Sequence, residues 1–490
     1  MHPVMDCLPS TAVVFRQNRN GLRWCRRHHA RGTGLVEHDI REEITGIEPL
    51  VAFIAAGEKP RAQWRVGTEH EKFPFLADTH APVPYDGERS IRALLEALRQ
   101  RLGWEPLVED GHLIGLRGAN CGKGCITLEP AGQFELSGAP LATIHETAAE
   151  MEEHMALLHE VAGAMGIGFL GMGAAPEWTF DAMPLMPKPR YGIMRAYMPK
   201  KGRLGLEMMH RTATVQSNLD FGSEADMVQK MRVSLALQPL ITALFANSPF
   251  TDGKPNGYLS WRSAIWLDTD ADRTGMLPFV FDEGFGYEAY VQYALDVPMY
   301  FVKREGRYID ASGQSFRDFM EGRLPALPGE HPTIDDWADH LTTLFPEVRL
   351  KRFIEMRGAD MGSARMVPAL SAFWVGLLYD TTALDAAWDV VKHWPVQEMQ
   401  RLRAEVPKLG LRAEIAGRSL RDVGREVLSI ADTGLARRNN VNARGQDERL
   451  HLQVLHEIIE TGRTQAEELL ARYHDDWHGD IRPVYAACAL

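Results

Sequence analysis

The sequence has few cysteines and no long hydrophobic run. Its five cysteines, at positions 7, 25, 121, 125 and 488, are an odd and scattered set. This pattern excludes a framework of paired disulfides and favours a reducing compartment. The most membrane-like stretch, Ala369–Tyr379, has only eleven residues, whereas a membrane-spanning helix needs about 20. We therefore expect no membrane span, and we interpret this stretch as a core segment.

Several common catalytic motifs are also missing. The sequence contains no G-x-x-x-x-G-K-[ST] loop, no G-x-G-x-x-G after a strand and no G-x-S-x-G elbow. Cys121 and Cys125 offer only two ligands, too few for a structural zinc site. The run 268–272, "DTDAD", is followed by Arg273 where a calcium loop requires glycine. Classical nucleotide loops, serine hydrolases and zinc or calcium sites of these types are thereby excluded.

Basic residues are fewer than acidic ones, which gives the protein a net charge of −12 and a pI near 5.9. This balance disfavours nucleic acid and anionic membranes as partners. Residues 1–34 are the exception, because they hold six arginines and Asp6 as the only acid. This composition is similar to that of a transit peptide, but we interpret the segment as a disordered extension. Residues 35–490 are expected to form a single catalytic domain, with a sheet core over about 63–365 and a helical annex over about 366–490.

The periodicity of apolar residues predicts an α+β fold, with antiparallel strands separated by helices and followed by the helical annex. Helices are expected over 37–62, 89–102, 140–166 and from the Ser223 cap toward residue 246, with Pro239 kinking or splitting the last. A second capping box is predicted at Thr464 and Glu467. Strands are expected over 63–76, 113–116, 126–128, 128–138, 168–173, 211–221 and 349–357.

Glu69 and Glu71 stand in the strand "GTEHEKFPF" at positions i and i+2. Both therefore point to the same face, about 7 Å apart. His70 points the other way and is expected to be structural. Two like charges on a half-buried face repel each other and are costly to desolvate. Either this face is wet, or a divalent cation lies between the two carboxylates.

Other strands repeat this pattern of polar residues on one side, which favours the cation. Gln133 and Glu135 share a face, as do Thr214, Gln216 and Asn218, and as do Glu355 and Arg357; Glu129 stands at a strand mouth. Carboxylates without cysteine suit hard cations such as Mg²⁺ or Mn²⁺. Magnesium is usually shared with substrate phosphates, so the pattern indicates nucleotide chemistry. Arginines could hold phosphate or carboxylate groups in two-pronged contacts, and the candidates are Arg211, Arg262, Arg273 and Arg357.

These motifs resemble the plant-type glutamate–cysteine ligases, a family also found in bacteria. The matching stretches include "WRVGTEHEKFPF" (64–75), "ITLEPAGQFELSGAPLATIHET" (126–147), "LGLEMMHRTATVQSNLDF" (204–221), "YLSWRSAIWLDTDADRTGMLPFVFD" (258–282) and "FPEVRLKRFIEMRGAD" (345–360). The resemblance implies a curved antiparallel sheet that forms a funnel, as in the catalytic half of glutamine synthetase, flanked by helices. It also implies ligation of glutamate, through its γ-carboxylate, to cysteine with ATP, the first step of glutathione synthesis.

The resemblance further implies roles for single residues. Two or three Mg²⁺ ions, with Mn²⁺ as an alternative, would be held by Glu69, Glu71, Glu129, Glu135, Gln216 and Glu355. Arg357 would stabilise the transferred phosphoryl group, with Glu355 beside it. Arg262 would hold the α-carboxylate of glutamate, in a pocket lined by Thr214 and near Arg211. The expected partners are glutamate, cysteine and ATP, and the expected state is a monomer or a homodimer.

Two alternatives remain open at this point: a carboxylate–amine ligase that uses another amine, and a phosphotransferase of the same fold. The cysteine pairs that plant members use for redox-controlled disulfides have no evident counterparts here; position 213, for example, is alanine. We therefore expect a bacterial cytoplasmic enzyme rather than a plastid one.

Overall fold

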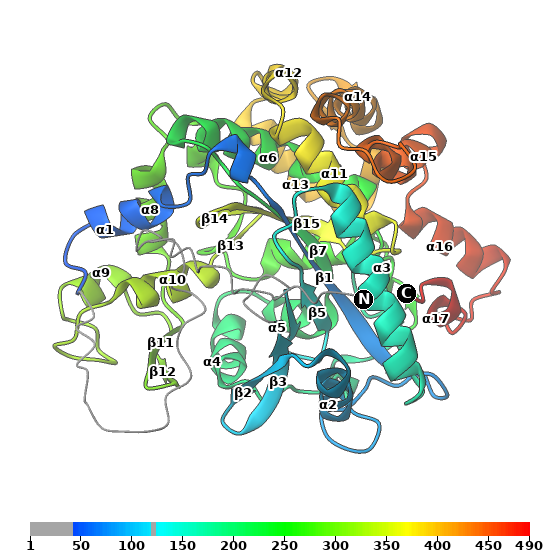
Figure 1. Ribbon diagram of the computed structural model, residues 1–490, viewed down its shortest axis with the longest axis horizontal. Coiled ribbons are helices and arrows are strands. Elements are labelled where there is room, and N and C mark those ends of the chain that lie inside the picture. The colour runs from blue at the N-terminus through cyan, green and yellow to red at the C-terminus, as the bar shows by residue number, and fades with distance from the viewer. Residues whose placement is uncertain (1–42, 119–123) are drawn as a thin grey trace, which may run out of the picture. The chain divides into compact units, whose positions relative to one another are not determined.

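The computed structural model describes residues 43–118 and 124–490, and from residue 43 onward these belong to one compact unit. The extension predicted over residues 1–34, and Cys121, lie outside the described residues. The division into one catalytic domain with an annex stays a prediction. Helices and strands alternate in the described part of residues 43–360, and helices dominate thereafter (Figure 1).

The described residues contain a nine-stranded sheet with the order β14-β15-β7-β1-β5-β4-β3-β2, in which β6 also pairs with β1. All of its ladders are antiparallel. Its strands are β1 (Val66–Leu76), β2 (Glu105–Glu109), β3 (His112–Arg117), β4 (Cys125–Leu128), β5 (Phe134–Ser137), β6 (Ile167–Leu170), β7 (Thr214–Leu219), β14 (Val348–Leu350) and β15 (Ile354–Asp360).

Strand β1 is the centre of this sheet. Its first part, Val66–His70, pairs with β7, and Glu69–Lys72 pairs with β5 on the other side. Its last part, Phe73–Leu76, pairs with β6 instead. One strand therefore joins three segments that lie far apart in the sequence.

The first half of the chain supplies the helices α1 (Glu48–Ala55), α2 (Ile91–Leu102), α3 (Ile144–Gly163), α4 (Pro189–Tyr197), α5 (Gly205–Arg211) and α6 (Glu224–Leu244). Their starts follow capping chemistry: Ser223 accepts a hydrogen bond from the backbone of Asp226, as predicted, and Thr143 forms a capping box with Glu146. Helix α6 continues through Pro239, so of the two predicted effects, a kink or a split, the split is wrong and the kink stays a prediction. This helix is buried almost all round, and its packing outweighs the hydrogen bond that proline cannot make.

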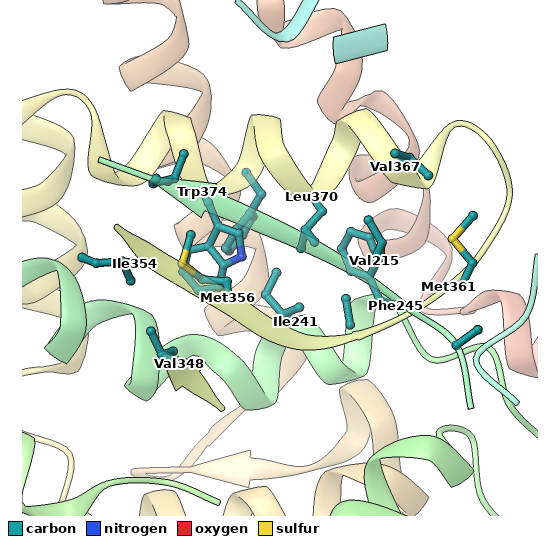
Figure 2. Close-up of a cluster of buried hydrophobic side chains, with 14 of the residues drawn as sticks. Val215, Ile241, Phe245, Val348, Ile354, Met356, Met361, Val367, Leu370 and Trp374 are labelled. Atoms are coloured by element: carbon teal, nitrogen blue, oxygen red, sulfur yellow. The ribbon is translucent and has the colours of Figure 1, made fainter. Parts of the chain in front are cut away.

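The apolar face of the sheet packs on α6 and on α11 (Met366–Leu378). Val215 of β7 and Ile354 and Met356 of β15 lie between Ile241 of α6 and the α11 residues Leu370 and Trp374 (Figure 2). These strand residues alternate with polar ones, so burying them directs the polar side chains to the opposite face. On the apolar side His70 lies against His154 and Lys72, as expected of a structural histidine.

The segment between α6 and β14 is a series of short elements. These are β8 (Phe250–Thr251), β9 (Lys254–Pro255), α7 (Trp261–Ile265), β10 (Thr274–Gly275), α8 (Tyr287–Asp296), β11 (Phe301–Arg304), β12 (Arg307–Asp310), α9 (Phe316–Met320), α10 (Ile334–Thr342) and β13 (Phe345–Pro346). Arg273, one of the predicted anion binders, forms an ion pair with Asp270 in which both side chains are fully buried. Arg273 therefore stabilises this segment.

After α11 come α12 (Thr381–Val391), α13 (Val396–Leu409), the hairpin β16–β17 (Glu414–Ile415 and Arg418–Ser419), α14 (Leu420–Arg438), α15 (Gln453–Thr461), α16 (Gln465–Asp475) and α17 (Val484–Ala487). The predicted capping box at Thr464 and Glu467 is present. Helices α11 and α14 touch backbone to backbone: a Cβ added to Gly434 would lie 1.8 Å from the carbonyl oxygen of Gly376.

The last residues of the chain return to the sheet. The backbone of Leu490 donates to Phe169 of β6, and Gly171 donates to the carbonyl of Cys488. Among the described residues no single helix is long and apolar enough to cross a membrane. Helices α11 and α12 have the required length and hydropathy only when they are taken together, and they are bent by 92° relative to each other.

Candidate active site

Four predicted acids meet on the polar face of the sheet. Glu69 and Glu71 both leave β1 on this face; in register, Glu71 lies opposite Glu135 of β5 and Glu69 opposite Gln216 of β7. Glu129 follows β4, which is the neighbour of β5. The alternation read from the sequence thus brings the predicted oxygen ligands together.

The central acids repel each other. Burial raises the pKa of Glu71 well above its usual range, and the charges of Glu129 and Glu135 raise it further. Burial also raises the pKa of Glu69 to about 7, with contributions from Glu355 and Glu135, and it raises that of Glu135. Within residues 43–118 and 124–490, none of these four acids forms an ion pair with a lysine or arginine within 4.0 Å, as the neighbouring Glu355 does. This face therefore gathers carboxyl groups that no described lysine or arginine neutralises at ion-pair distance.

Neutral donors hold these carboxylates in place. Asn218 Nδ2 donates to Glu69 Oε1 over 2.7 Å, and the backbone of Thr214 donates to Glu71 Oε2 over 3.0 Å. Glu135 accepts hydrogen bonds from the hydroxyls of Thr127 and Ser137. Each carboxylate keeps lone pairs that these bonds do not use.

Glu355 has the opposite environment. Its carboxylate is fully buried and accepts from Arg349 over 2.7 and 2.8 Å, while Lys351 Nζ lies 3.0 Å away and Arg357 also contacts it. Burial alone would raise its pKa, but the three cations outweigh burial and hold the pKa well below the usual range. Glu355 is therefore ionised and paired.

The predicted pair of Glu355 and Arg357 does lie on one face, and Arg357 reaches further across the sheet. Its Nη1 donates to Gln216 Oε1 over 2.7 Å. Arg262 Nη2 donates to the backbone carbonyl of Arg357 over 2.9 Å. Both arginines line one pocket, whose other walls are Ser263, Trp266, Phe345, Pro346, Glu347, Gly358 and Arg403.

The structure does not bring the remaining predicted substrate contacts to this pocket. The hydroxyl of Thr214 donates to the carbonyl of Ala359, so its backbone rather than its side chain faces Glu71. Arg211 pairs with Asp252 over 2.7 Å and with Glu207 over 3.3 Å. Gln133 lies in the turn before β5, where its amide bonds the carbonyls of Met209 and Thr212; its predicted place in a strand beside Glu135 is wrong.

Arg349 and Lys351 are site residues that the sequence reasoning missed. We predicted one strand over 349–357, whereas the chain forms a hairpin of β14 and β15 in which Arg349 lies opposite Glu355. The turn contains neither glycine nor proline, so the usual signal of a hairpin was absent. The alternation of Val348, Arg349, Leu350 and Lys351 was the signal that could have found the two cations.

The donor set suits a hard divalent cation, because it consists of carboxylate and amide oxygens, which such cations prefer. A bound cation would supply the charge that these acids lack. In the part of the chain that the structure describes, however, no three His, Cys, Asp or Glu side chains are already arranged to hold one ion. The residues fit such a group in chemistry, and their side chains have to adjust to bind it.

Comparison with known proteins identifies the family to which this chain belongs. The model of glutamate-cysteine ligase family 2 matches residues 65–487. The chain belongs to this family. It is 54% identical over 438 residues to the chloroplastic glutamate–cysteine ligase of Brassica juncea, covering 89% of this chain and 83% of the relative. The enzyme of Arabidopsis thaliana is also 54% identical, with 82% of it covered.

A solved structure supports the fold of this ligase. The glutamate–cysteine ligase of Francisella tularensis, crystallised in complex with AMP, aligns with a TM-score of 0.51 over 86% of this chain and 88% of that one, at 12% identity. The predicted α+β ligase fold and the prediction of an enzyme of this family are confirmed. The predicted bacterial cytoplasm is wrong, because the curated relatives at 54% identity are chloroplastic enzymes.

Proposed function

We propose that this ligase joins the γ-carboxylate of L-glutamate to the amine of L-cysteine with ATP, giving γ-glutamylcysteine for glutathione synthesis. One observation carries the proposal. On a single sheet face, the unneutralised acids at Glu69, Glu71 and Glu135 adjoin a pocket lined by Arg262 and Arg357. Acids that require cations, beside arginines that require anions, fit a metal–nucleotide complex and an anionic amino acid.

The chemistry proceeds in two displacements. An oxygen of the γ-carboxylate attacks the γ-phosphorus of ATP, the bond to the β-phosphate oxygen breaks, and ADP leaves. The amine of cysteine then attacks the carbonyl carbon of the γ-glutamyl phosphate, the carbon–oxygen bond to phosphate breaks, and phosphate leaves. The amine proton passes to solvent or phosphate. Phosphoryl transfer depends mainly on positioning and charge neutralisation.

The residues of this chain divide these tasks. Arg357 would stabilise the charge that builds on the transferred phosphoryl group, and Glu355 positions Arg357 through their ion pair. Arg262 would bind the α-carboxylate of glutamate without the side chains of Thr214 and Arg211, whose partners lie elsewhere. Glu69, Glu71, Glu129, Glu135, Gln216 and Glu355 would hold two or three Mg²⁺ ions. Bound magnesium neutralises the phosphate charges.

The test is an assay with purified protein, glutamate, MgATP and one amine at a time. Phosphate release that depends on cysteine, together with γ-glutamylcysteine detected by mass spectrometry, is the expected result. Release with a different amine only would replace the proposed substrate. ADP formed without free phosphate would indicate a phosphotransferase and contradict the proposal.

Two substitutions test the assigned residues. Glu71→Gln and Arg357→Ala should each lower kcat by about 10²–10³-fold, because each removes charge that acts in the transition state. Exposed Arg365, which pairs with Glu457 at the surface, supplies the control Arg365→Ala with unchanged kcat. Rates close to wild type in the first two variants, with an intact fold by circular dichroism, would refute their roles.

A further inference from the structure

Asp360, the last residue of β15, is a buried carboxylate that joins three segments of the chain. Its Oδ1 accepts from Ser260 Oγ over 2.8 Å. Its Oδ2 accepts from Ser248 Oγ over 2.7 Å and from the backbone of Asn247 over 3.0 Å. Both oxygens thus act as acceptors, as in an ionised carboxylate. Within residues 43–118 and 124–490 no lysine or arginine nitrogen lies within 4.0 Å of it, in contrast to Glu355.

The two serines that donate to Asp360 also hold the helix that carries Arg262. Ser260 caps α7 by accepting from the backbone of Ser263 over 3.2 Å. Ser248 Oγ accepts from the backbone of Arg262 itself over 3.1 Å. A hydroxyl can donate to one group and accept from another. Each serine therefore links Asp360 to the first turn of α7.

The surroundings of Asp360 leave it little freedom to move. A Cβ added to Gly173 would lie 2.4 Å from Cγ of Asp360, so this close approach requires glycine. The amide of Asn247 donates to the carbonyls of Gly171 and Met361 over 3.0 Å each. Since Met361 follows Asp360 directly, Asn247 holds this part of the chain at two points. The carboxylate is therefore fixed relative to β15.

Asp360 also acts on Arg262 through its charge. Arg262 is 3% exposed, and its Nη2 donates to the carbonyl of Arg357 over 2.9 Å. In the described ranges no carboxylate oxygen lies within 4.0 Å of its guanidinium, but Asp360, Glu71 and Glu347 attract it from further away. Burial lowers the pKa of Arg262, and the charge of Asp360 is the largest of those that counter burial. A carboxylate in contact would occupy the guanidinium fork, whereas a more distant one stabilises the charge and leaves the fork available for a ligand.

We propose that Asp360 is a positioning residue for Arg262. Through Ser248 and Ser260 it fixes α7 against β15, and it thereby holds the guanidinium where the α-carboxylate of glutamate binds. The inference rests on the proposed function, in which Arg262 binds that group. Asp360 itself does not line the pocket.

This role explains how the two arginines of the pocket keep their spacing. Arg357 belongs to β15, and Arg262 is linked to the end of the same strand through Asp360. Glutamate must hold its α-carboxylate at Arg262 while its γ-carboxylate meets the phosphoryl group near Arg357. A single strand therefore determines the distance between the two ends of the substrate, and small displacements at such a site are costly.

The test is the KM for glutamate in two variants. Asp360→Asn keeps the size of the side chain but removes its charge and one acceptor oxygen. We expect kcat/KM for glutamate to fall about 10- to 100-fold, mainly through KM, because a displaced Arg262 no longer meets the carboxylate. KM for cysteine and for MgATP should stay within about twofold of wild type. Ser248→Ala keeps the carboxylate and removes one link, and it should raise KM for glutamate about 3- to 10-fold even if Asp360→Asn does not fold.

Two further variants separate positioning from a general loss of structure. Asp380→Asn changes another buried carboxylate, which caps α12 over 3.0 Å and pairs with Arg437, and it should leave KM for glutamate unchanged. Arg262→Lys should itself raise KM for glutamate. In that background Asp360→Asn should add little, because two residues that act through one contact are not additive.

Three results would overturn the inference. The first is a KM for glutamate close to wild type in both Asp360→Asn and Ser248→Ala. The second is an equal rise in KM for all three substrates, which would indicate general damage to the site. The third is a pair of effects, from Asp360→Asn and Arg262→Lys, that multiply in the double variant.

Failure of the proposed function would look different. The wild type would then release no phosphate with glutamate and cysteine, or Arg262→Lys would leave KM for glutamate unchanged. The first result would refute the reaction, and the second would refute the assignment of Arg262, whatever Asp360→Asn does.

Discussion

At the residue scale, the state of charge of Glu355 separates it from the other glutamates on its face. Three cations surround it, whereas Glu69, Glu71 and Glu135 have none within ion-pair distance in the described ranges. Glu355 is thus already neutralised by protein groups. For it to bind a metal, Arg357 has to turn from the carboxylate toward the phosphate.

Removing Arg349 should expose the cost of this buried charge. In Arg349→Met, Glu355 keeps two cations of three, and we expect the free energy of unfolding in urea to fall by about 3 kcal/mol. The double variant Arg349→Met/Glu355→Gln should recover part of the loss, because no uncompensated carboxylate remains. Arg365→Met, at the exposed pair with Glu457, should cost less than about 1 kcal/mol. Equal losses at both sites would contradict this account.

The raised pKa of Glu69 predicts a pH dependence. Between its ordinary value of 4.5 and about 7, the folded protein holds a proton that the unfolded chain has lost. This glutamate therefore makes the free energy of unfolding decrease as pH rises through that window, with no further change above it. Urea unfolding at several pH values should show a steeper decrease in the wild type than in Glu69→Gln, in which the raised pKa values of Glu71 and Glu135 still contribute. A constant difference between the two proteins would refute it.

The same charge predicts how magnesium acts without substrates. Magnesium must displace protons from these carboxylates at low pH but not at high pH. The rise in Tm on adding Mg²⁺ should therefore be larger at pH 8 than at pH 6, and Glu71→Gln should reduce it at both. Calcium-free buffers and a sodium control at equal ionic strength exclude screening as the cause. A rise that does not depend on pH would contradict the assignment of the acids as ligands.

At the element scale, α11 and α14 show how closely packing constrains the helical part. Alanine favours a helix over glycine by about 1 kcal/mol, yet at Gly434 its Cβ would overlap the backbone of Gly376. Gly434→Ala should lower the free energy of unfolding by about 1–3 kcal/mol or more. Gly192→Ala in α4, where no atom lies within 4 Å of the added Cβ, should raise it by about 0.5–1 kcal/mol. A rise in both variants would show that helix propensity alone governs these positions.

The elements also show what the sequence can predict. The alternation of polar and apolar residues correctly predicted one face of the sheet for five residues: Glu69, Glu71, Glu135, Gln216 and Glu355. It succeeded because burial of the apolar side chains determines which way the polar ones point in each strand. It failed at 349–357, since a hairpin without glycine or proline reads as one strand. It also could not show that Arg357 donates to Gln216, because such a contact joins segments that lie far apart in the chain.

At the scale of the whole molecule, residues 488–490 connect the end of the chain to β6. Deleting them removes the hydrogen bonds at Phe169 and Gly171 and uncovers the edge of that strand. We expect the free energy of unfolding to fall by about 2 kcal/mol, with more aggregation by light scattering. Leu490→Ala keeps the backbone bonds and separates their effect from that of the side chain. Unchanged stability after the deletion would show that this contact contributes nothing.

Strand β1 has a consequence for biosynthesis. It leaves the ribosome before any of its three partners, the last of which ends at Leu219, and β15 completes the sheet only at Asp360. A nascent chain of 200 residues would thus display a strand with no neighbour on one side. This enzyme should reach its native sheet only after most of its length has been translated.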